Sequence, residues 1–498
     1  MKISFLGHSQ FIVELENSQR KTVRILNDVW LTDFAFGDFL QRNPTWNFSE
    51  NFLGKLDFIY ISHPHCDHLD PYSLFWIYQK QNPEIILPEN LSFLVPLFKH
   101  YLPKTQIIHI LKNQEPLKLE GITFLGRTFN PTYETNERDV MTLFISNDRE
   151  VIFIEEDCAI PDEEENHEFL YRNFTKKQYE NRIYLAIRNE LEGFFLSTDE
   201  QDTQKRKEKV RLYIQKRKKE IEWEYEKFLE YPQWKNIYRL KNFIKIYIGQ
   251  GMIYPIKLSK DLLHISAPFS LETLCKYENQ VKSHYSYNFP TVNQEVGYTF
   301  EIQKGKVIRK SIFSFTFEYY PTFFRDLNFI KIIQDRPVFN HKRNREEQTK
   351  ILELLLNRFY VYLTSNPKIP VIDLFKKQYS LKFLYGDSIQ STPIFYQLDF
   401  SSWNFRQKES LNEFYETYWL NDIEDFYKGK LDVFSSTLLN LKDDKTFYFW
   451  TMLGLPFLNN DIVYNKIKYH FERAFSNQNV EDYVLPIILD KIKIIKEN

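Results

Sequence analysis

One short stretch constrains this chain more than any other: residues 58–71, where an apolar segment leads directly into a group of histidines. Residues 58–61 are rich in β-branched and aromatic side chains, which predicts a buried strand. Asp70 and Pro71 close the stretch, and Asp at the cap with Pro in the first turn indicates the start of a helix. Between the strand and the helix lie three histidines and an aspartate, His63, His65, Asp67 and His68.

This grouping predicts a metal site. Imidazole and carboxylate together suit zinc, iron or manganese. In an extended loop His63 and His65 point to the same side, so they can share one metal. Asp67 and His68 fall where the chain turns into the helix, so they can serve a second, neighbouring metal. A polar loop with incidental histidines is the alternative, but the whole chain of 498 residues holds only 11 histidines. So tight a group favours metal binding.

Composition bounds the rest of the molecule. The length predicts two or three domains, and 43% hydrophobic residues are enough for a large core. With 65 basic and 67 acidic residues, the chain has no overall charge that would attract nucleic acid or a membrane surface. Three cysteines, Cys66, Cys158 and Cys275, argue against a disulfide framework. We find no signal peptide and no apolar run long enough to span a bilayer, so we expect a cytoplasmic protein.

The motif resembles the His-x-His-x-Asp-His signature of the metallo-β-lactamase superfamily, and here it reads His63-x-His65-x-Asp67-His68. The resemblance implies an α/β fold, the αββα sandwich, with one or two metals at the ends of its strands. Short strands at residues 2–5, 11–14, 22–25 and 29–32 fit its first part. Asp33 follows the last of them and is a candidate for holding a metal-bound histidine, with a turn aspartate as the equal alternative. His8 has the same two interpretations, and we favour a turn or core histidine.

The next segments alternate as such a sandwich requires. We expect helices at 72–80 and 91–100, and strands at 84–87, 106–110, 116–119, 121–127, 139–146 and 151–155. Asp157 ends the last strand, where the superfamily bridges its two metals, so the resemblance assigns it that role. A strand-end capping aspartate is the alternative.

The superfamily usually adds a third histidine to the first metal from the loop before this hairpin, but no histidine occurs between His109 and His167. The loop offers Glu137, which has the better spacing, and Glu134 in reserve. Two imidazoles and a carboxylate suit Fe(II) and oxygen chemistry better than zinc hydrolysis. Exposed loop glutamates are the alternative. For the last ligand of the second metal, which the superfamily takes from a later histidine, His264 is the first candidate and His284 the second.

The first domain is expected to cover residues 1–320. It contains a charged, mostly helical insertion at about 161–240, whose basic runs favour a solvated helix face over nucleic-acid binding. A hairpin at 297–302 and 306–308 closes it. Residues 321–498 are expected to form a separate α+β module.

Within the superfamily, the chain looks most like the branch of the CMP-N-acetylneuraminate hydroxylases. The likeness rests on residues 59–62 and 69–74 around the motif, on 137–139, on Asp157-Cys158, and on the order of segments 398–400 and 422–440. It implies an oxygenase that hydroxylates the N-acetyl group of a nucleotide-linked sugar with electrons from outside. Those enzymes carry a Rieske domain with two Cys and two His in paired motifs, and the three cysteines here form no such pair. A separate electron-transfer protein is therefore expected.

We therefore predict a di-iron oxygenase that hydroxylates a small molecule, with a nucleotide sugar as one candidate substrate. Its two divalent metals would be held by His63, His65, Glu137, Asp67, His68, His264 and Asp157. A zinc- or manganese-dependent hydrolase of a phosphoester, amide or lactone is the alternative, with a metal-bound water as nucleophile and Asp67 relaying a proton. A non-catalytic scaffold is a third hypothesis, but the intact motif argues against it.

Overall fold

The computed structural model describes the greater part of the chain. The described residues are 1–32, 34–35, 40–42, 53–103, 106–128, 140–158, 160, 163–188, 203–249, 252–253, 271–312, 343–365, 369, 374, 379–385, 393–399, 404–410, 415–430, 438–441, 448–455 and 458–476. The chain splits into two compact units: Met1–Ala35, Leu40–Pro131 and Arg138–Asp326 belong to the first, and most of the second lies in Leu327–Asn498. The expected boundary near residue 320 stays a prediction, because 313–342 lie outside the described residues.

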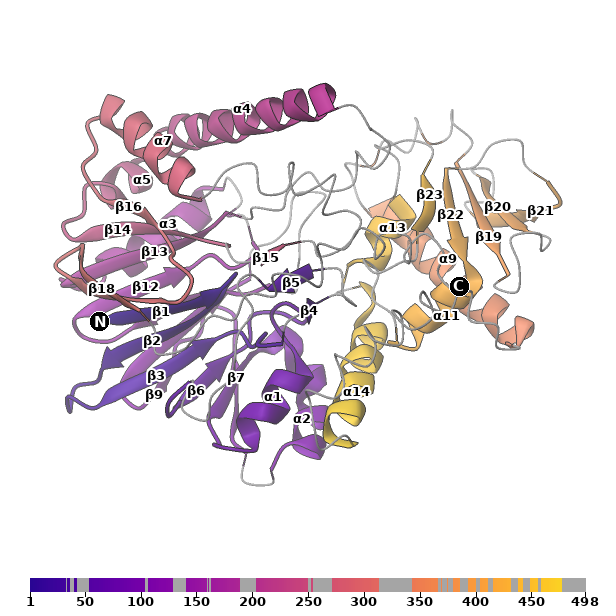
Figure 1. Ribbon diagram of the computed structural model, residues 1–498, viewed down its shortest axis with the longest axis horizontal. Helices are drawn as coiled ribbons and strands as arrows, with labels where there is room; N and C mark the ends of the chain where they lie inside the picture. Colours follow the sequence, from indigo (N-terminus) through magenta and orange to yellow (C-terminus); the bar gives the residue numbers. More distant parts are fainter. Residues whose placement is uncertain are drawn as a thin grey trace. The chain divides into compact units, whose positions relative to one another are not determined.

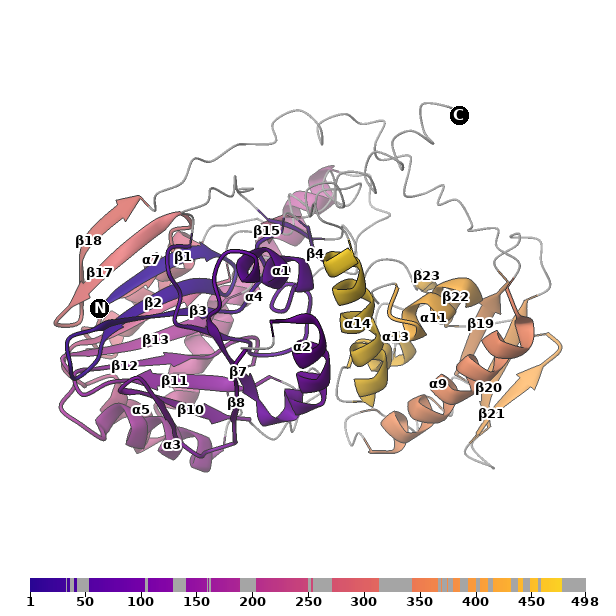
Figure 2. The ribbon, with the colours of Figure 1, turned by 90° about the horizontal axis from the view of Figure 1, so that it is seen from below.

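An eight-stranded mixed sheet forms one half of the first unit. Its order is β18-β17-β1-β2-β3-β6-β7-β8, with β1 (Lys2–Gly7), β2 (Gln10–Glu16), β3 (Thr22–Asn27), β6 (Phe58–Tyr60), β7 (Glu84–Pro88), β8 (Ile108–Leu111), β17 (Tyr298–Gln303) and β18 (Lys306–Ile312). The closing hairpin β17–β18 pairs with the first strand, so the two ends of the unit meet in one sheet (Figure 2). The strand expected at 29–32 is wrong. Val29 makes only an isolated bridge to Leu69, which ties the end of β3 to the histidine loop.

A seven-stranded sheet forms the other half. Its order is β16-β14-β13-β12-β11-β10-β9, with β9 (Leu117–Leu119), β10 (Ile122–Arg127), β11 (Thr142–Ser146), β12 (Glu150–Ile154), β13 (Asn181–Ile187), β14 (Phe243–Ile248) and β16 (Thr291–Asn293). The described part of 161–240 is mostly helical, as expected, but it also contains β13, which was not expected. This strand is almost entirely buried and pairs in parallel with both β12 and β14, so the segment contributes to the sandwich itself.

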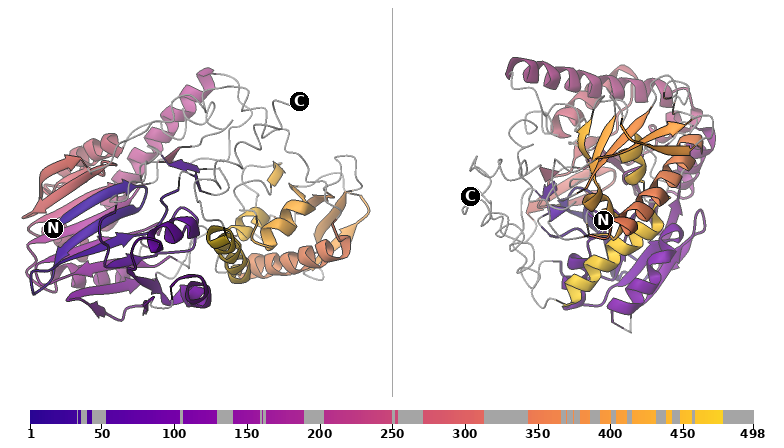
Figure 3. Two further views of the ribbon diagram at one scale, coloured as in Figure 1. Left: turned by 60° about the horizontal axis from the view of Figure 1, so that its bottom comes forward. Right: turned by 90° about the vertical axis from the view of Figure 1, so that its right-hand side faces the viewer.

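Helices cover both outer faces of the paired sheets, as Figures 1 and 3 show. α3 (Glu164–Thr175), α4 (Thr203–Phe228), α5 (Pro232–Ile237) and α7 (Leu271–His284) pack on the second sheet through a core that includes Phe153, Phe174 and Trp234. η1 (Glu89–Leu94), α1 (Pro71–Tyr78) and α2 (Val95–Tyr101) lie beside the first sheet. Between the sheets, side chains such as Ile25, Tyr60 and Ile154 form a second core. The predicted αββα sandwich is confirmed.

Sheet topology brings several loops to one edge. β3 and β6 are parallel, and β1 runs in the same direction because β1–β2 and β2–β3 are both antiparallel. Parallel strands end at the same edge of a sheet. The residues that follow β1, β3 and β6 therefore come together, and the last of these begin the histidine loop. α1 starts as predicted: Asp70 accepts the backbone N–H groups of Tyr72 and Ser73, with Pro71 in the first turn.

The second unit has its own sheet, order β21-β20-β19-β22-β23, formed by β19 (Ser380–Leu384), β20 (Ile394–Asp399), β21 (Asn404–Lys408), β22 (Glu416–Trp419) and β23 (Leu438–Leu441). Its helices are α9 (Arg345–Ser365), α11 (Leu420–Tyr427), α13 (Tyr448–Leu453) and α14 (Asn460–Ser476). A core of its own includes Phe359, Phe383 and Phe449.

A small sheet of β4 (Phe34–Ala35), β5 (Leu40–Arg42) and β15 (Met252–Ile253) completes the described strands. Over the described part of the chain, no helix combines the length and the apolar composition that crossing a membrane requires.

Candidate metal centre

The histidine loop, the β1–β2 turn and the loop after β12 meet at one place. Two overlapping groups of side chains lie there, and in each group one nitrogen or oxygen atom per residue falls within 4.8 Å of all the others. One group holds His63, His65 and Asp157, and the other holds His8, Asp67, His68 and Asp157. Asp157 belongs to both groups, so its carboxylate lies within 4.8 Å of the candidate ligand atoms of each.

The first group is formed by neighbouring residues of one loop. The Nε2 atom of His63 lies 3.1 Å from Nδ1 of His65 and 3.9 Å from Oδ2 of Asp157. The Nδ1 atom of His63 is 2.9 Å from the hydroxyl of Ser62, which fixes the orientation of the ring. His63 is fully buried and His65 partly exposed, so this group faces solvent on one side.

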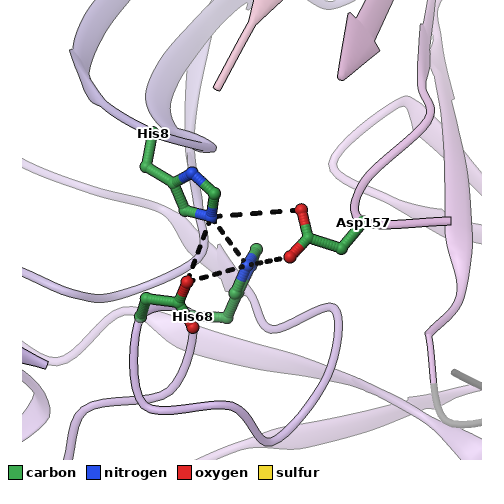
Figure 4. A group of neighbouring side chains, drawn as sticks. His8, His68 and Asp157 are labelled. Carbon is green, nitrogen blue, oxygen red and sulfur yellow. Dashed lines mark hydrogen bonds and ion pairs between the residues drawn. The ribbon is translucent and has the colours of Figure 1, made fainter. Parts of the chain in front are cut away.

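The second group draws on more distant parts of the chain (Figure 4). The Nε2 atom of His68 lies 3.1 Å from Oδ2 of Asp157 and 3.0 Å from Nε2 of His8. The Nε2 atom of His8 is in turn 3.3 Å from Oδ2 of Asp67. His8 does occupy a buried turn, as the sequence predicts, but its ring points into the group.

Asp28, which the sequence analysis did not single out, holds His68 in place. Its Oδ2 atom is 2.6 Å from Nδ1 of His68. The same carboxylate accepts the backbone N–H and the hydroxyl of Ser62 at 2.8 and 2.9 Å. A carboxylate accepts from the Nδ1–H of an imidazole, so in the neutral form of His68 this contact selects the tautomer whose Nε2 carries a lone pair. That lone pair faces the second group, as a metal ligand requires.

The charges around His68 call for a cation. Burial lowers the pKa of His68, but the carboxylates of Asp157, Asp28 and Asp67 raise it well above its ordinary value. Burial raises the pKa of Asp157, yet His68, His8 and His63 bring it far below the usual range. The carboxylates therefore favour a positive charge at this place, which either a proton or a metal ion supplies.

Unpaired atoms point the same way. Oδ1 of Asp67 and Oδ1 of Asp157 are buried without a hydrogen-bond partner. Leaving a buried polar atom unpaired costs roughly 1–3 kcal/mol. Burial, with His68 and His65, holds the pKa of His63 well below its ordinary value, so this imidazole stays neutral and available as a ligand. The donor set of imidazole and carboxylate fits zinc, iron or manganese.

Glu156 is a second residue that the sequence analysis missed. It is fully buried, neither carboxyl oxygen has a hydrogen-bond partner, and it forms a further group with Asp28 and His68. Burial and the nearby Asp28 raise its pKa well above the ordinary value, so the side chain is held protonated. It also has a positive φ of 53°.

Several predicted residues are not found in these groups. Asp33, Glu134, Glu137 and His264 lie outside the described residues, so their roles stay predictions. Three further histidines that the sequence analysis named contact other groups: His109 contacts Glu84 at 2.6 Å, His167 accepts from the indole of Trp234 at 2.7 Å, and His284 contacts the carbonyl of Gln280 at 2.9 Å.

Comparison with known proteins yields distant likenesses. No family model matches the chain. A protein of Mycolicibacterium smegmatis, described as a Rieske 2Fe-2S iron–sulfur protein, is 25% identical over 118 residues, which are 24% of this chain and 21% of that protein. The chain thus matches about a fifth of that relative's length, and the likeness to the hydroxylase branch stays a prediction.

Among solved structures, the chain is similar to two proteins of this fold. The di-iron β-hydroxylase CmlA from Streptomyces venezuelae has a TM-score of 0.33 at 9% identity, over 62% of this chain and 54% of that one. The metallo-β-lactamase fold protein YhfI from Bacillus subtilis has a TM-score of 0.32 at 13% identity, over 60% of this chain and 99% of that one.

Proposed function

We propose that this chain is an iron-dependent oxygenase that hydroxylates a small molecule at a two-metal centre. The observation that carries the proposal is the convergence of His63, His65, His68, Asp67 and Asp157, with ring nitrogens and carboxylate oxygens facing one another inside a buried edge of the sandwich. Asp157 lies in both groups and is the proposed bridge between the metals.

The ligands of the first metal favour iron. His63 and His65 supply two imidazoles, and the sequence from His109 to His167 contains no other histidine. We assign the next position to Glu137, with Glu134 as the alternative. Two histidines and one carboxylate, with positions left for O2 and substrate, form the ligand set of non-haem Fe(II) oxygenases.

The proposed reaction needs an electron source. One C–H bond of the substrate breaks and a C–OH bond forms, while the second oxygen atom of O2 leaves as water. This balance takes up two electrons and two protons, which a separate one-electron transfer protein and solvent would supply. Iron, when bound, supplies the activation of O2. Asp67, whose Oδ1 atom has no hydrogen-bond partner, is the proposed carrier of a proton at the centre.

Anaerobic purification followed by metal analysis tests this proposal. We expect two iron ions per chain, and O2 uptake when a chemical reductant is added. A nucleotide-linked N-acetyl sugar is the first substrate to try. His65→Ala should abolish both iron retention at the first position and O2 uptake. His109→Ala removes a histidine that contacts Glu84 outside the groups, and it should change neither.

Stoichiometric zinc or manganese without O2 uptake would overturn the oxygenase. In that case the same ligands would serve a hydrolase, in which a metal-bound water attacks a phosphoester, amide or lactone. Assay of these three substrate classes with the zinc- or manganese-loaded protein then decides that alternative.

A further inference from the structure

We propose that His8 is a direct ligand of the second metal, together with Asp67, His68 and Asp157. The inference rests on the two-metal centre of the proposed function but not on its oxygen chemistry. The resemblance to the metallo-β-lactamase superfamily implies a late histidine for this position, with His264 the first candidate. Among the described residues, the histidine that lies beside Asp67, His68 and Asp157 is instead His8, in the first turn of the chain.

The distances fit one bound ion. Ligand atoms that surround a tetrahedral metal at about 2.1 Å are roughly 3.4 Å from one another. The Nε2 atom of His8 lies 3.0 Å from Nε2 of His68, 3.3 Å from Oδ2 of Asp67 and 4.0 Å from Oδ1 of Asp157. These values bracket the expected separation. Figure 4 shows the three labelled side chains pointing toward one centre.

The hydrogen bonds of His8 do not explain why it is there. The Nδ1 atom of His8 is buried without a hydrogen-bond partner, so hydrogen bonding within the protein satisfies this ring only in part. Its Nε2 atom faces Nε2 of His68, whose other ring nitrogen contacts the Asp28 carboxylate. At this distance a proton or a cation lies between the two nitrogens, and carboxylate oxygens of Asp67 and Asp157 lie within 4.0 Å of the same His8 atom.

The backbone at His8 is bent toward this position. His8 has a φ of 48° and the preceding Gly7 a φ of 127°. The left-handed conformation costs a non-glycine residue roughly 1–2 kcal/mol. Such strain persists where the surrounding structure requires it, and it clusters at functional sites. Here it turns the imidazole at the end of β1 toward the histidine loop.

If His8 is a ligand, the two metals differ in how many protein ligands surround them. The second metal would have four protein ligands, which is a complete tetrahedral set. The first would have His63, His65 and the shared Asp157 among the described residues, and His65 is partly exposed. Small molecules would therefore reach the first metal, while the second holds the bridge in place.

Metal counting on the full-length chain tests the proposal. His8→Asn is the variant of choice, because Asn tolerates the left-handed backbone but is too short to reach the centre. The metal-free chain is loaded with Zn²⁺ or Co²⁺, and bound metal is counted after gel filtration. We expect two ions in the wild type, one in His8→Asn, and two in the control His109→Asn.

A parallel His264→Asn variant separates the two candidates. Retention of two ions by His8→Asn overturns the proposal, whatever His264→Asn does. Loss of one ion from His8→Asn supports it, and loss from both variants adds His264 as a further ligand. A Zn²⁺-loaded chain that shows this pattern but no O2 uptake with iron would sink the oxygenase and keep the His8 assignment.

A measurement on the wild type covers the case in which His8→Asn does not fold. Metal-catalysed oxidation with bound Fe²⁺, ascorbate and O2 converts metal-bound histidines to 2-oxohistidine, which peptide mass spectrometry locates. We expect modification at His8 and His68 but not at His109 or His167. Modification at His68 with His8 left intact would overturn the assignment.

Discussion

Asp28 is expected to influence metal affinity at the proposed centre, although it is not itself a proposed ligand. Asp28 contacts Nδ1 of His68 at 2.6 Å and also accepts two hydrogen bonds from Ser62. Asp28→Asn keeps the size of the side chain but removes the charge and one acceptor. We expect the second metal to bind about 10- to 100-fold more weakly, because carboxylates behind a ligating histidine orient it and raise its basicity. Competition with a chromophoric chelator measures this affinity.

Glu14→Gln is the matched control at this scale. Glu14 lies on β2 of the same sheet, where its partly buried carboxylate pairs with Arg24 at 2.7 Å. Its loss should leave the affinity unchanged. Equal affinities for Asp28→Asn and the wild type would show that Asp28 serves only the packing of the strand ends.

The grouping of side chains was predictable where it depends on local spacing. The motif from His63 to His68 is continuous in sequence, so its grouping follows from the loop alone. Asp28 and His8 join the site through the alignment of three parallel strand ends, which the sequence does not display. A usable signal existed for Asp28: it directly follows a strand, as the histidine loop does, and parallel neighbours end at the same edge.

At the scale of elements, Glu416 joins two segments of the second unit. It begins β22, is fully buried, and accepts the backbone N–H groups of Phe449 and Trp450 in the first turn of α13 at 3.1 and 3.0 Å. The hydroxyls of Tyr379 and Tyr418 also donate to it. Burial outweighs these bonds and raises the pKa of Glu416 from 4.5 to about 7.

This raised pKa predicts a pH-dependent stability. Between pH 4.5 and 7 the folded chain holds a proton that the unfolded chain has lost, so the free energy of unfolding falls as pH rises through this window. Across this window Glu416 lowers the free energy of unfolding by about 3 kcal/mol. Urea denaturation, followed by circular dichroism at several pH values, should show a shallower fall in Glu416→Gln than in the wild type. Glu353→Gln, on the exposed side of α9, should follow the wild type; equal slopes for all three would contradict the assignment.

Elements were predictable where their pattern was strong. Segments bounded by polar turns gave β1, β2, β3, β7 and the closing hairpin within a few residues. Two failures have physical reasons. Residues 29–32 are apolar enough for a strand, but the chain bridges to the histidine loop there instead of extending the sheet. The strand at residues 181–187 was not predicted because charged segments flank it. Its burial on both faces is typical of a central parallel strand.

At the scale of the whole molecule, the centre links the two sheets of the sandwich. The proposed ligands follow β1 and β6 in one sheet and β12 in the other. A metal whose free concentration is a hundred times its dissociation constant adds about 2.7 kcal/mol to the stability of the state that binds it. The same metal neutralises carboxylates that otherwise face one another. Removal of metal should therefore loosen the sandwich at this edge while its core between the sheets remains.

Hydrogen–deuterium exchange checks this expectation with peptide resolution. After treatment with a chelator, deuterium uptake should rise in residues 61–70 and in the loop after β12, because these backbones are held by the ligand side chains. Uptake in β22 and α9 of the second unit should stay constant, because that unit has a hydrophobic core of its own. The His8→Asn and Asp28→Asn variants should resemble the chelated wild type even with metal present in modest excess. Uptake that is the same with and without metal at residues 61–70 would mean that these side chains hold one another in place unaided, and the centre would then be a hydrogen-bonded cluster and no metal site.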